Sequence, residues 1–99
     1  MSKDNLSDIL NKLKAYKPIL QQRYPISYLG VFGSYVRDEQ NSNSDVDILI
    51  DVSQSISLFR LLQIEEDIAK YLGKKVDLVM RAALRKRIGQ RILSEVVDI

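Results

Sequence analysis

Apolar side chains recur at helical spacing in three separate parts of the chain. The first pattern covers residues 6–16, the second residues 58–72 and the third residues 84–97. Apolar residues three and four positions apart lie on one face of an α-helix, where they can pack against a core. The pattern therefore predicts three amphipathic helices, and their apolar positions are interpreted as core rather than as ligand contacts.

Start and stop residues refine the ends of these helices. Asp4 can cap the first helix, because a short carboxylate accepts hydrogen bonds from free backbone N–H groups. Pro18 interrupts the pattern, and since proline suits the first turn of a helix, we expect a second short helix over residues 18–23. Pro25 ends that helix, because the residue before a proline avoids the helical region. Gly73 is a typical C-terminal stop for the helix that precedes it.

Between the helical patterns lie short runs rich in branched and aromatic residues. They predict strands over Ile26–Phe32, Val46–Val52 and Lys75–Met80. Gly30, inside the first strand, indicates close backbone packing or a bulge. We expect a short helix from Ser34 to about Asp38, directly after that strand.

The order of these elements predicts the fold class. Helix, helix, strand, short helix, strand, helix, strand and helix are typical of a small α/β (α+β) domain with a mixed β-sheet. We expect residues 1–99 to form a single domain, because a chain of this length builds one modest core. Helices should cover one face of the sheet, and the carboxylates of the strands should line the other, uncovered face, where a substrate can reach them.

Composition narrows the chemistry that is available. The chain has no cysteine and no histidine, which excludes disulfides, thiolate metal sites and histidine bases. Carboxylates must therefore carry any acid–base or metal chemistry. No apolar stretch approaches the roughly 20 residues of a membrane span, and the N-terminus is polar, so we expect an intracellular, cytoplasmic protein without a membrane partner.

Charge is distributed unevenly along the chain. Residues 30–51 contain one cation and five anions, whereas residues 81–99 contain five cations and two anions. An acidic patch between basic flanks suits a site for metal and phosphate. The basic run Arg85-Lys86-Arg87, with Arg91, could bind phosphate, nucleic acid or an acidic protein, or could simply be a solvated helix face.

One stretch, residues 33–51, combines these features. Gly33-Ser34 follows an apolar strand, Arg37 is its single cation, and a polar loop, Asn41-Ser42-Asn43-Ser44, leads to Asp45-Val46-Asp47. Alternate residues of a strand share a face, so the two carboxylates lie roughly 6–7 Å apart along the strand. Like charges this close repel each other, and a divalent cation such as Mg²⁺ would remove the penalty.

In this order and spacing, Gly33-Ser34, Arg37, Ser44-Asp45 and Asp47 resemble the signature of the minimal nucleotidyltransferases (MNT), within the DNA-polymerase-β-like nucleotidyltransferase superfamily. The resemblance covers nearly the whole chain. It implies a nucleotidyltransferase-like fold and transfer of a nucleotide from ATP or another nucleoside triphosphate. It also implies two Mg²⁺ ions, with Mn²⁺ as a possible substitute.

The resemblance also implies roles for individual residues. Asp45 and Asp47 bridge the metals, and a third carboxylate from a neighbouring strand completes the catalytic and metal-binding set. Asp77 fits that third position, and Asp51 is its competitor, because it lies on the same face as Asp45 and Asp47.

Nucleotide binding is assigned by the same resemblance to Gly33, Ser34, Arg37 and Ser44. Gly33 lets the ligand approach the backbone, and Ser34 contacts a phosphate through its hydroxyl and backbone N–H. Arg37 either adds positive charge to the triphosphate site or fixes the loop by pairing with an acid. Both readings of Arg37 stay open at this point.

Small proteins of the MNT type serve as antitoxins beside a toxin with a higher-eukaryote-and-prokaryote nucleotide-binding (HEPN) domain. The resemblance implies transfer of AMP to a tyrosine of such a toxin, and an oligomer with it. The alternative is a non-catalytic antitoxin that neutralises its partner by contact. A nucleic-acid-binding domain is a third reading, which the acidic patch disfavours.

Overall fold

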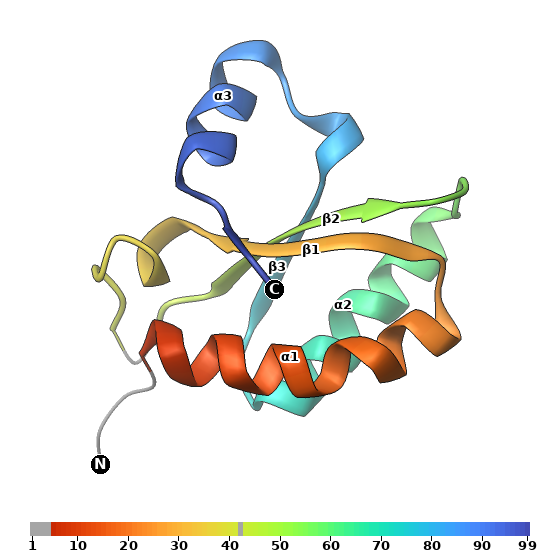
Figure 1. Ribbon diagram of the computed structural model, residues 1–99, viewed down its shortest axis with the longest axis horizontal. Helices are drawn as coiled ribbons and strands as arrows, with labels where there is room; N and C mark the ends of the chain where they lie inside the picture. Colours follow the sequence, from red (N-terminus) through yellow and green to blue (C-terminus); the bar gives the residue numbers. More distant parts are fainter. Residues whose placement is uncertain (1–4, 42) are drawn as a thin grey trace.

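The structure, a computed structural model, describes residues 5–41 and 43–99. Its elements in chain order are α1 (Leu6–Arg23), β1 (Ile26–Phe32), the 3₁₀ turn η1 (Gly33–Tyr35), β2 (Val46–Val52), α2 (Leu58–Leu72), β3 (Val76–Met80), the 3₁₀ turn η2 (Arg81–Ala83), α3 (Lys86–Glu95) and β4 (Val97–Asp98) (Figure 1). The expected helix cap at Asp4 and the loop residue Ser42 lie outside the described residues.

The four strands form one mixed sheet in the order β3-β2-β1-β4. β1 pairs with β2 and with β4 in antiparallel fashion, whereas β2 and β3 run parallel. A parallel pair needs a long crossover, and α2 supplies it between β2 and β3. The predicted small α/β fold with a mixed sheet is confirmed.

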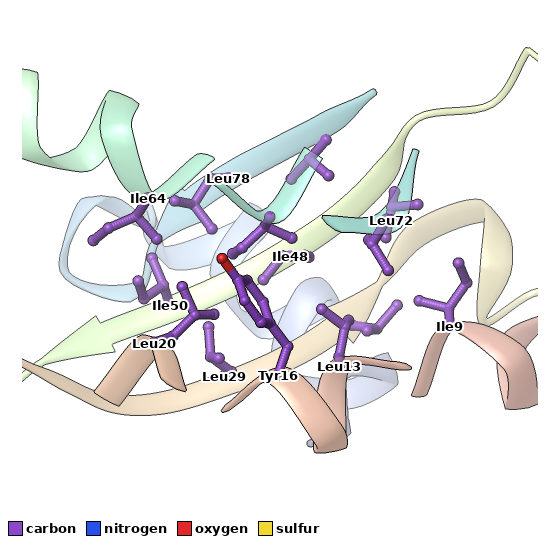
Figure 2. Close-up of a cluster of buried hydrophobic side chains, with 14 of the residues drawn as sticks. Ile9, Leu13, Tyr16, Leu20, Leu29, Ile48, Ile50, Ile64, Leu72 and Leu78 are labelled. Carbon is purple, nitrogen blue, oxygen red and sulfur yellow. The ribbon is translucent and has the colours of Figure 1, made fainter. Parts of the chain in front are cut away.

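The hydrophobic core lies between one face of this sheet and the two longer helices. α1 and α2 cross that face side by side (Figure 1). Buried side chains from both helices meet those of the strands (Figure 2). Fully buried members from the helices are Ile9, Leu13, Leu20, Ile64 and Ile68, and those from the strands include Leu29, Val31, Val46, Ile48 and Ile50.

Strand alternation sends the acidic residues of β2 to the opposite face. Because Ile48 and Ile50 enter the core, Asp47 and its alternate neighbours point away from α1 and α2. α3 lies on this second side of the sheet (Figure 1). The acidic face is therefore bordered by the C-terminal helix rather than left entirely open.

The N-terminal helix differs from the prediction. α1 runs without a break from Leu6 to Arg23, and Pro18 lies inside it, so the expected second helix over residues 18–23 is wrong. Tyr16 and Leu20 on either side of the proline are both buried on the core face. Packing of this face stabilises one continuous helix despite the backbone hydrogen bond that proline removes.

The last helical pattern and the short helix after β1 also end earlier than expected. Val96 and Val97 were expected on the helix face, but α3 ends at Glu95, and Val97–Asp98 pairs with β1 as β4. The free edge of β1 offers backbone partners that a local pattern does not reveal. The expected helix from Ser34 to about Asp38 is only the three-residue turn η1.

Other boundaries agree closely with the sequence. β1 and β2 have the predicted limits, and β3 begins one residue later than predicted, at Val76. α2 ends at Leu72 and is capped by Gly73, whose backbone is left-handed (φ 66°). A Cβ at Gly30 would meet the side chains of Tyr28 and Val96, which confirms close packing there. In the described part of the chain, none of the helices has the length and apolar character that crossing a membrane would require.

Candidate functional site

Asp47 is the centre of the acidic face. It lies in β2, directly in register with Asp77 on the parallel neighbour β3. Register partners on adjacent strands point to the same face, so the two carboxylates share one side of the sheet. Asp45 precedes β2 by one residue and adds a third negative charge nearby. The structure thus brings together the three carboxylates that the sequence selected.

The electrostatics of Asp47 reflect this crowding. Burial, together with the negative charges of Asp77 and Asp45, raises the pKa of Asp47 to about 6. The guanidinium of Arg37 opposes the shift, whereas Glu95 adds to it. The site therefore holds more negative charge than its own cations neutralise, which is the condition under which a divalent cation binds.

Asp51, the competitor of Asp77, lies elsewhere. It is four residues beyond Asp47 in β2, roughly 13 Å along the strand. Its carboxylate accepts the backbone N–H of Val52 at 3.0 Å. It borders a cavity of about 430 Å³ with Met80 and Ala82, which is larger than the cavity beside Asp47 but holds only this one carboxylate. The geometry therefore favours Asp77 as the third acid.

The turn after β1 lies against Asp47. Gly33 has a left-handed backbone (φ 82°), and a Cβ at this position would overlap the carboxylate oxygen Oδ2 of Asp47. Only glycine accommodates both conditions. Ser34 follows at the surface of this turn, and its hydroxyl makes no hydrogen bond within residues 5–41 and 43–99. The phosphate-binding role of Ser34 stays a prediction.

Arg37 is held in place by two acids. Its guanidinium pairs with Glu39, and its Nη1 lies 3.1 Å from each carboxylate oxygen of Glu95. Glu95 Oε1 also accepts the backbone N–H of Gly33 at 3.2 Å. Of the two roles open for Arg37, this pairing favours fixing the loop rather than adding free positive charge.

Glu95 is a site residue that sequence reasoning missed. It ends α3, 62 residues from Gly33 in sequence, and its side chain is only 18% exposed. The sequence shows Glu95 as an acid within the basic residues 81–99, but the charge pattern does not indicate which residue it contacts. Its contacts fasten the C-terminal helix to the turn beside Asp47.

Ser44 has a structural role in the loop before β2. Its hydroxyl oxygen accepts the backbone N–H of Asn41 at 2.9 Å, and its own N–H donates to the carbonyl of Asn41 at 3.1 Å. A second cavity, of about 300 Å³, lies beside Ser44 and Asp45 and is lined on its other side by Lys74 and Lys75. The nucleotide-binding role of Ser44 stays a prediction.

The donor set suits a hard divalent cation, because carboxylate oxygens are the preferred ligands of Mg²⁺. As the side chains lie, however, the described residues contain no group of three or more carboxylates gathered closely enough to hold a metal ion. Asp45 and Asp47 lie at the start of β2 and Asp77 at the start of β3, so the three carboxylates share one end of the parallel strand pair without forming a closed ligand set.

A cavity of about 270 Å³ opens between the sheet and α3. Asp47, Gly33 and Arg37 form its inner wall, and Ile88, Arg91, Ile92 and Glu95 of α3, together with Phe32, complete it. The cavity thus joins the acidic group, the glycine turn and the basic C-terminal helix. Its lining combines two acids, two cations and apolar side chains.

Comparison with known proteins agrees with this geometry. The sequence model described as "Nucleotidyltransferase domain" matches residues 13–99. The protein adenylyltransferase MntA of Thermococcus cleftensis is 44% identical over 92 residues, covering 93% of this chain and 93% of that protein.

Solved structures share the fold. One, described as a candidate minimal nucleotidyltransferase, superposes with a TM-score of 0.83 at 25% identity, over 100% of both chains. Another is the complex of a tri-AMPylated HEPN toxin of Shewanella oneidensis with an MNT antitoxin, with a TM-score of 0.65. It covers 90% of this chain and 68% of that one, and at 20% identity it shows the fold alone.

The family match spans most of the chain, and its relative of 44% identity is matched almost end to end. The structure places Gly33 against Asp47, and Asp77 lies in register with Asp47 on the parallel neighbour strand. This chain belongs to the nucleotidyltransferase domain family and is a nucleotidyltransferase of the minimal type.

Proposed function

We propose that this chain transfers AMP from ATP to a tyrosine hydroxyl of a HEPN-type toxin and thereby acts as its antitoxin. The observation that carries the proposal is the placement of Gly33 against Asp47, with Asp77 in register beside it. The choice of AMP and of a protein acceptor is supported by the named activity of the relative MntA. The choice of toxin class is supported by the complex of an MNT antitoxin with an AMPylated HEPN toxin.

The reaction is an in-line displacement at the α-phosphorus of ATP. The acceptor oxygen forms a bond to this phosphorus, the bond to the β-phosphate oxygen breaks, and pyrophosphate leaves. The acceptor proton passes to a carboxylate, for which Asp77 is suited because its side chain is exposed at the sheet edge. The Gly33 turn and the hydroxyl of Ser34 would position the phosphates.

Asp45, Asp47 and Asp77 would hold Mg²⁺ at this site. A bound divalent cation there would neutralise charge that develops on the phosphate, which carboxylates alone cannot do. The raised pKa of Asp47, caused by burial and by its acidic neighbours, marks the negative charge that such a cation would balance.

The direct test uses a HEPN-domain toxin as the acceptor. The toxin is incubated with substoichiometric amounts of this protein, Mg²⁺ and ATP, and its intact mass is measured before and after. We expect a gain of AMP mass on most toxin molecules and its loss on mutation of a single toxin tyrosine. Asp47→Asn should bind the toxin yet leave its mass unchanged, whereas Asp51→Asn, the matched control on the same strand, should remain active.

A different result would favour neutralisation by contact. Such an antitoxin would silence the toxin only at equal molarity, with no mass gain from any of the four ribonucleoside triphosphates. Unchanged transfer by Asp47→Asn would instead show that the acidic group described here is not the reaction site.

A further inference from the structure

Arg37 lies close to the turn at Gly33, but two acids already neutralise its positive charge. Two carboxylates, those of Glu39 and Glu95, contact its guanidinium. Nε contacts Glu39 and Nη1 contacts Glu95, so a triphosphate that approached this guanidinium would meet the negative charge of both acids. Since charge-assisted pairs of this kind are among the stronger hydrogen bonds, they work against binding of the triphosphate by Arg37.

Arg91, in contrast to Arg37, has no acidic partner among the described residues. It lies in α3, one helical turn before Glu95, and its side chain is exposed. Within residues 5–41 and 43–99 its guanidinium has no carboxylate partner and no hydrogen bond. It nevertheless lines the cavity of about 270 Å³ that also contains Gly33 and Asp47. An unpaired cation thus faces the acidic site from the other wall.

The contacts of Glu95 explain how Arg91 is placed there. Residues four apart lie on the same face of a helix, so fixing Glu95 against Gly33 and Arg37 turns Arg91 toward the same cavity. The other four cations of residues 81–99 do not line the cavity: Arg81, Arg85, Lys86 and Arg87. Only one member of the basic run is therefore brought to the site.

We propose that Arg91 binds the β- and γ-phosphates of the nucleotide, a role for which Arg37 is less suited because Glu39 and Glu95 already balance its charge. The inference rests on the proposed function, because it takes a nucleoside triphosphate as the ligand of this cavity. A guanidinium presents a fork of N–H donors that matches phosphate oxygens, and it keeps its charge at all relevant pH values. The C-terminal helix then contributes to substrate binding as well as to packing.

The test is calorimetric binding of ATP and of AMP, each with MgCl₂, to the wild-type protein and three variants. Arg91→Gln should weaken ATP binding by roughly 10-fold or more, as expected for loss of a charge-assisted contact. Arg91→Lys should fall between the two, because it keeps the charge but not the fork. Arg87→Gln removes the same charge from the same helix outside the cavity and should change ATP affinity by less than about 2-fold.

AMP lacks the β- and γ-phosphates, so its affinity should be the same in all four proteins. Equal ATP affinities of Arg91→Gln and Arg87→Gln, with wild-type binding intact, would overturn the role of Arg91 and leave the proposed function standing. Absence of ATP binding by the wild-type protein would overturn both. If Arg91→Gln also lowers the melting temperature, the Arg91→Lys variant decides the question. An ATP affinity of Arg91→Lys equal to that of the wild type would exclude a contact that depends on the guanidinium fork.

Discussion

Gly33 lies against the carboxylate of Asp47, so closely that a single added methyl group would overlap the oxygen Oδ2. The two residues belong to different elements, the turn after β1 and the start of β2. Their contact couples the turn that would bind phosphate to the strand that would bind metal. The absence of a side chain at Gly33 therefore allows the turn and the strand to lie this close together.

Gly33→Ala should damage both stability and binding. A left-handed backbone disfavours alanine by about 1 kcal/mol or more, and the overlap with Asp47 should bring the loss to about 2–4 kcal/mol. Binding of Mg²⁺–ATP should fall below detection. Gly73→Ala is the matched control, since its backbone is also left-handed (φ 66°) but its Cβ would meet nothing within 4 Å. Urea unfolding and calorimetry measure both effects, and equal losses in the two variants would contradict the coupling.

Asp77→Asn and Asp51→Asn distinguish the two candidates for the third acid. Asp77 is the register partner of Asp47, so its loss should lower AMP transfer by roughly 100-fold or more. Asp51 lies at the far end of the strand, and its loss should lower transfer by less than about 3-fold. Initial rates of pyrophosphate release with saturating ATP give the comparison. The reverse ranking would assign the third carboxylate to Asp51.

Asp47 should make stability depend on pH when no metal is present. Its pKa rises from 3.8 to about 6 in the folded protein because it is buried beside Asp77 and Asp45. Between these two values the folded state keeps a proton that the unfolded chain releases. The free energy of unfolding therefore falls as pH rises from about 4 to about 6, and the loss is complete above that range.

Replacement by asparagine removes this penalty. In EDTA, Asp47→Asn should melt several degrees above the wild type at pH 7.5 and at nearly the same temperature at pH 4, a difference on the order of 1–2 kcal/mol after allowance for solvent screening. Differential scanning calorimetry across this range provides the check. A variant that is less stable than the wild type at pH 7.5 would contradict the assigned cause.

Glu95→Gln should loosen the C-terminal helix. The substitution removes the charge that Arg37 contacts and weakens the acceptor of the Gly33 N–H, so we expect a loss of about 1–2 kcal/mol and faster amide exchange in α3 and β4. Glu66→Gln is the control, because its pair with Lys70 is exposed and such pairs contribute about 0.5 kcal/mol or less. Exchange rates that match in the two variants would show that Glu95 does not fasten the helix.

Local patterns sufficed for most of the fold. The stripe from Leu58 to Leu72 and the stop at Gly73 predicted α2 to the residue, because burial of one helix face and a left-handed cap are encoded within a few positions. The limits of β1 and β2 followed from branched and aromatic runs. The two carboxylates of the Asp-x-Asp strand were also evident, since alternation along a strand is a local property.

What the tertiary structure decided concerns residues far apart in the chain. Pro18 indicated a helix break, but core packing on both sides of it keeps α1 continuous. Val97 was expected in a helix, but it pairs with the open edge of β1 as a strand. The sequence left Asp77 and Asp51 open, because the register of β2 and β3 depends on how α2 crosses between them. Glu95 reaches Gly33 across 62 residues, a contact that depends on where α3 docks and that no spacing rule contains. Short-range patterns fix which residues share a face, whereas chain topology alone determines which faces meet.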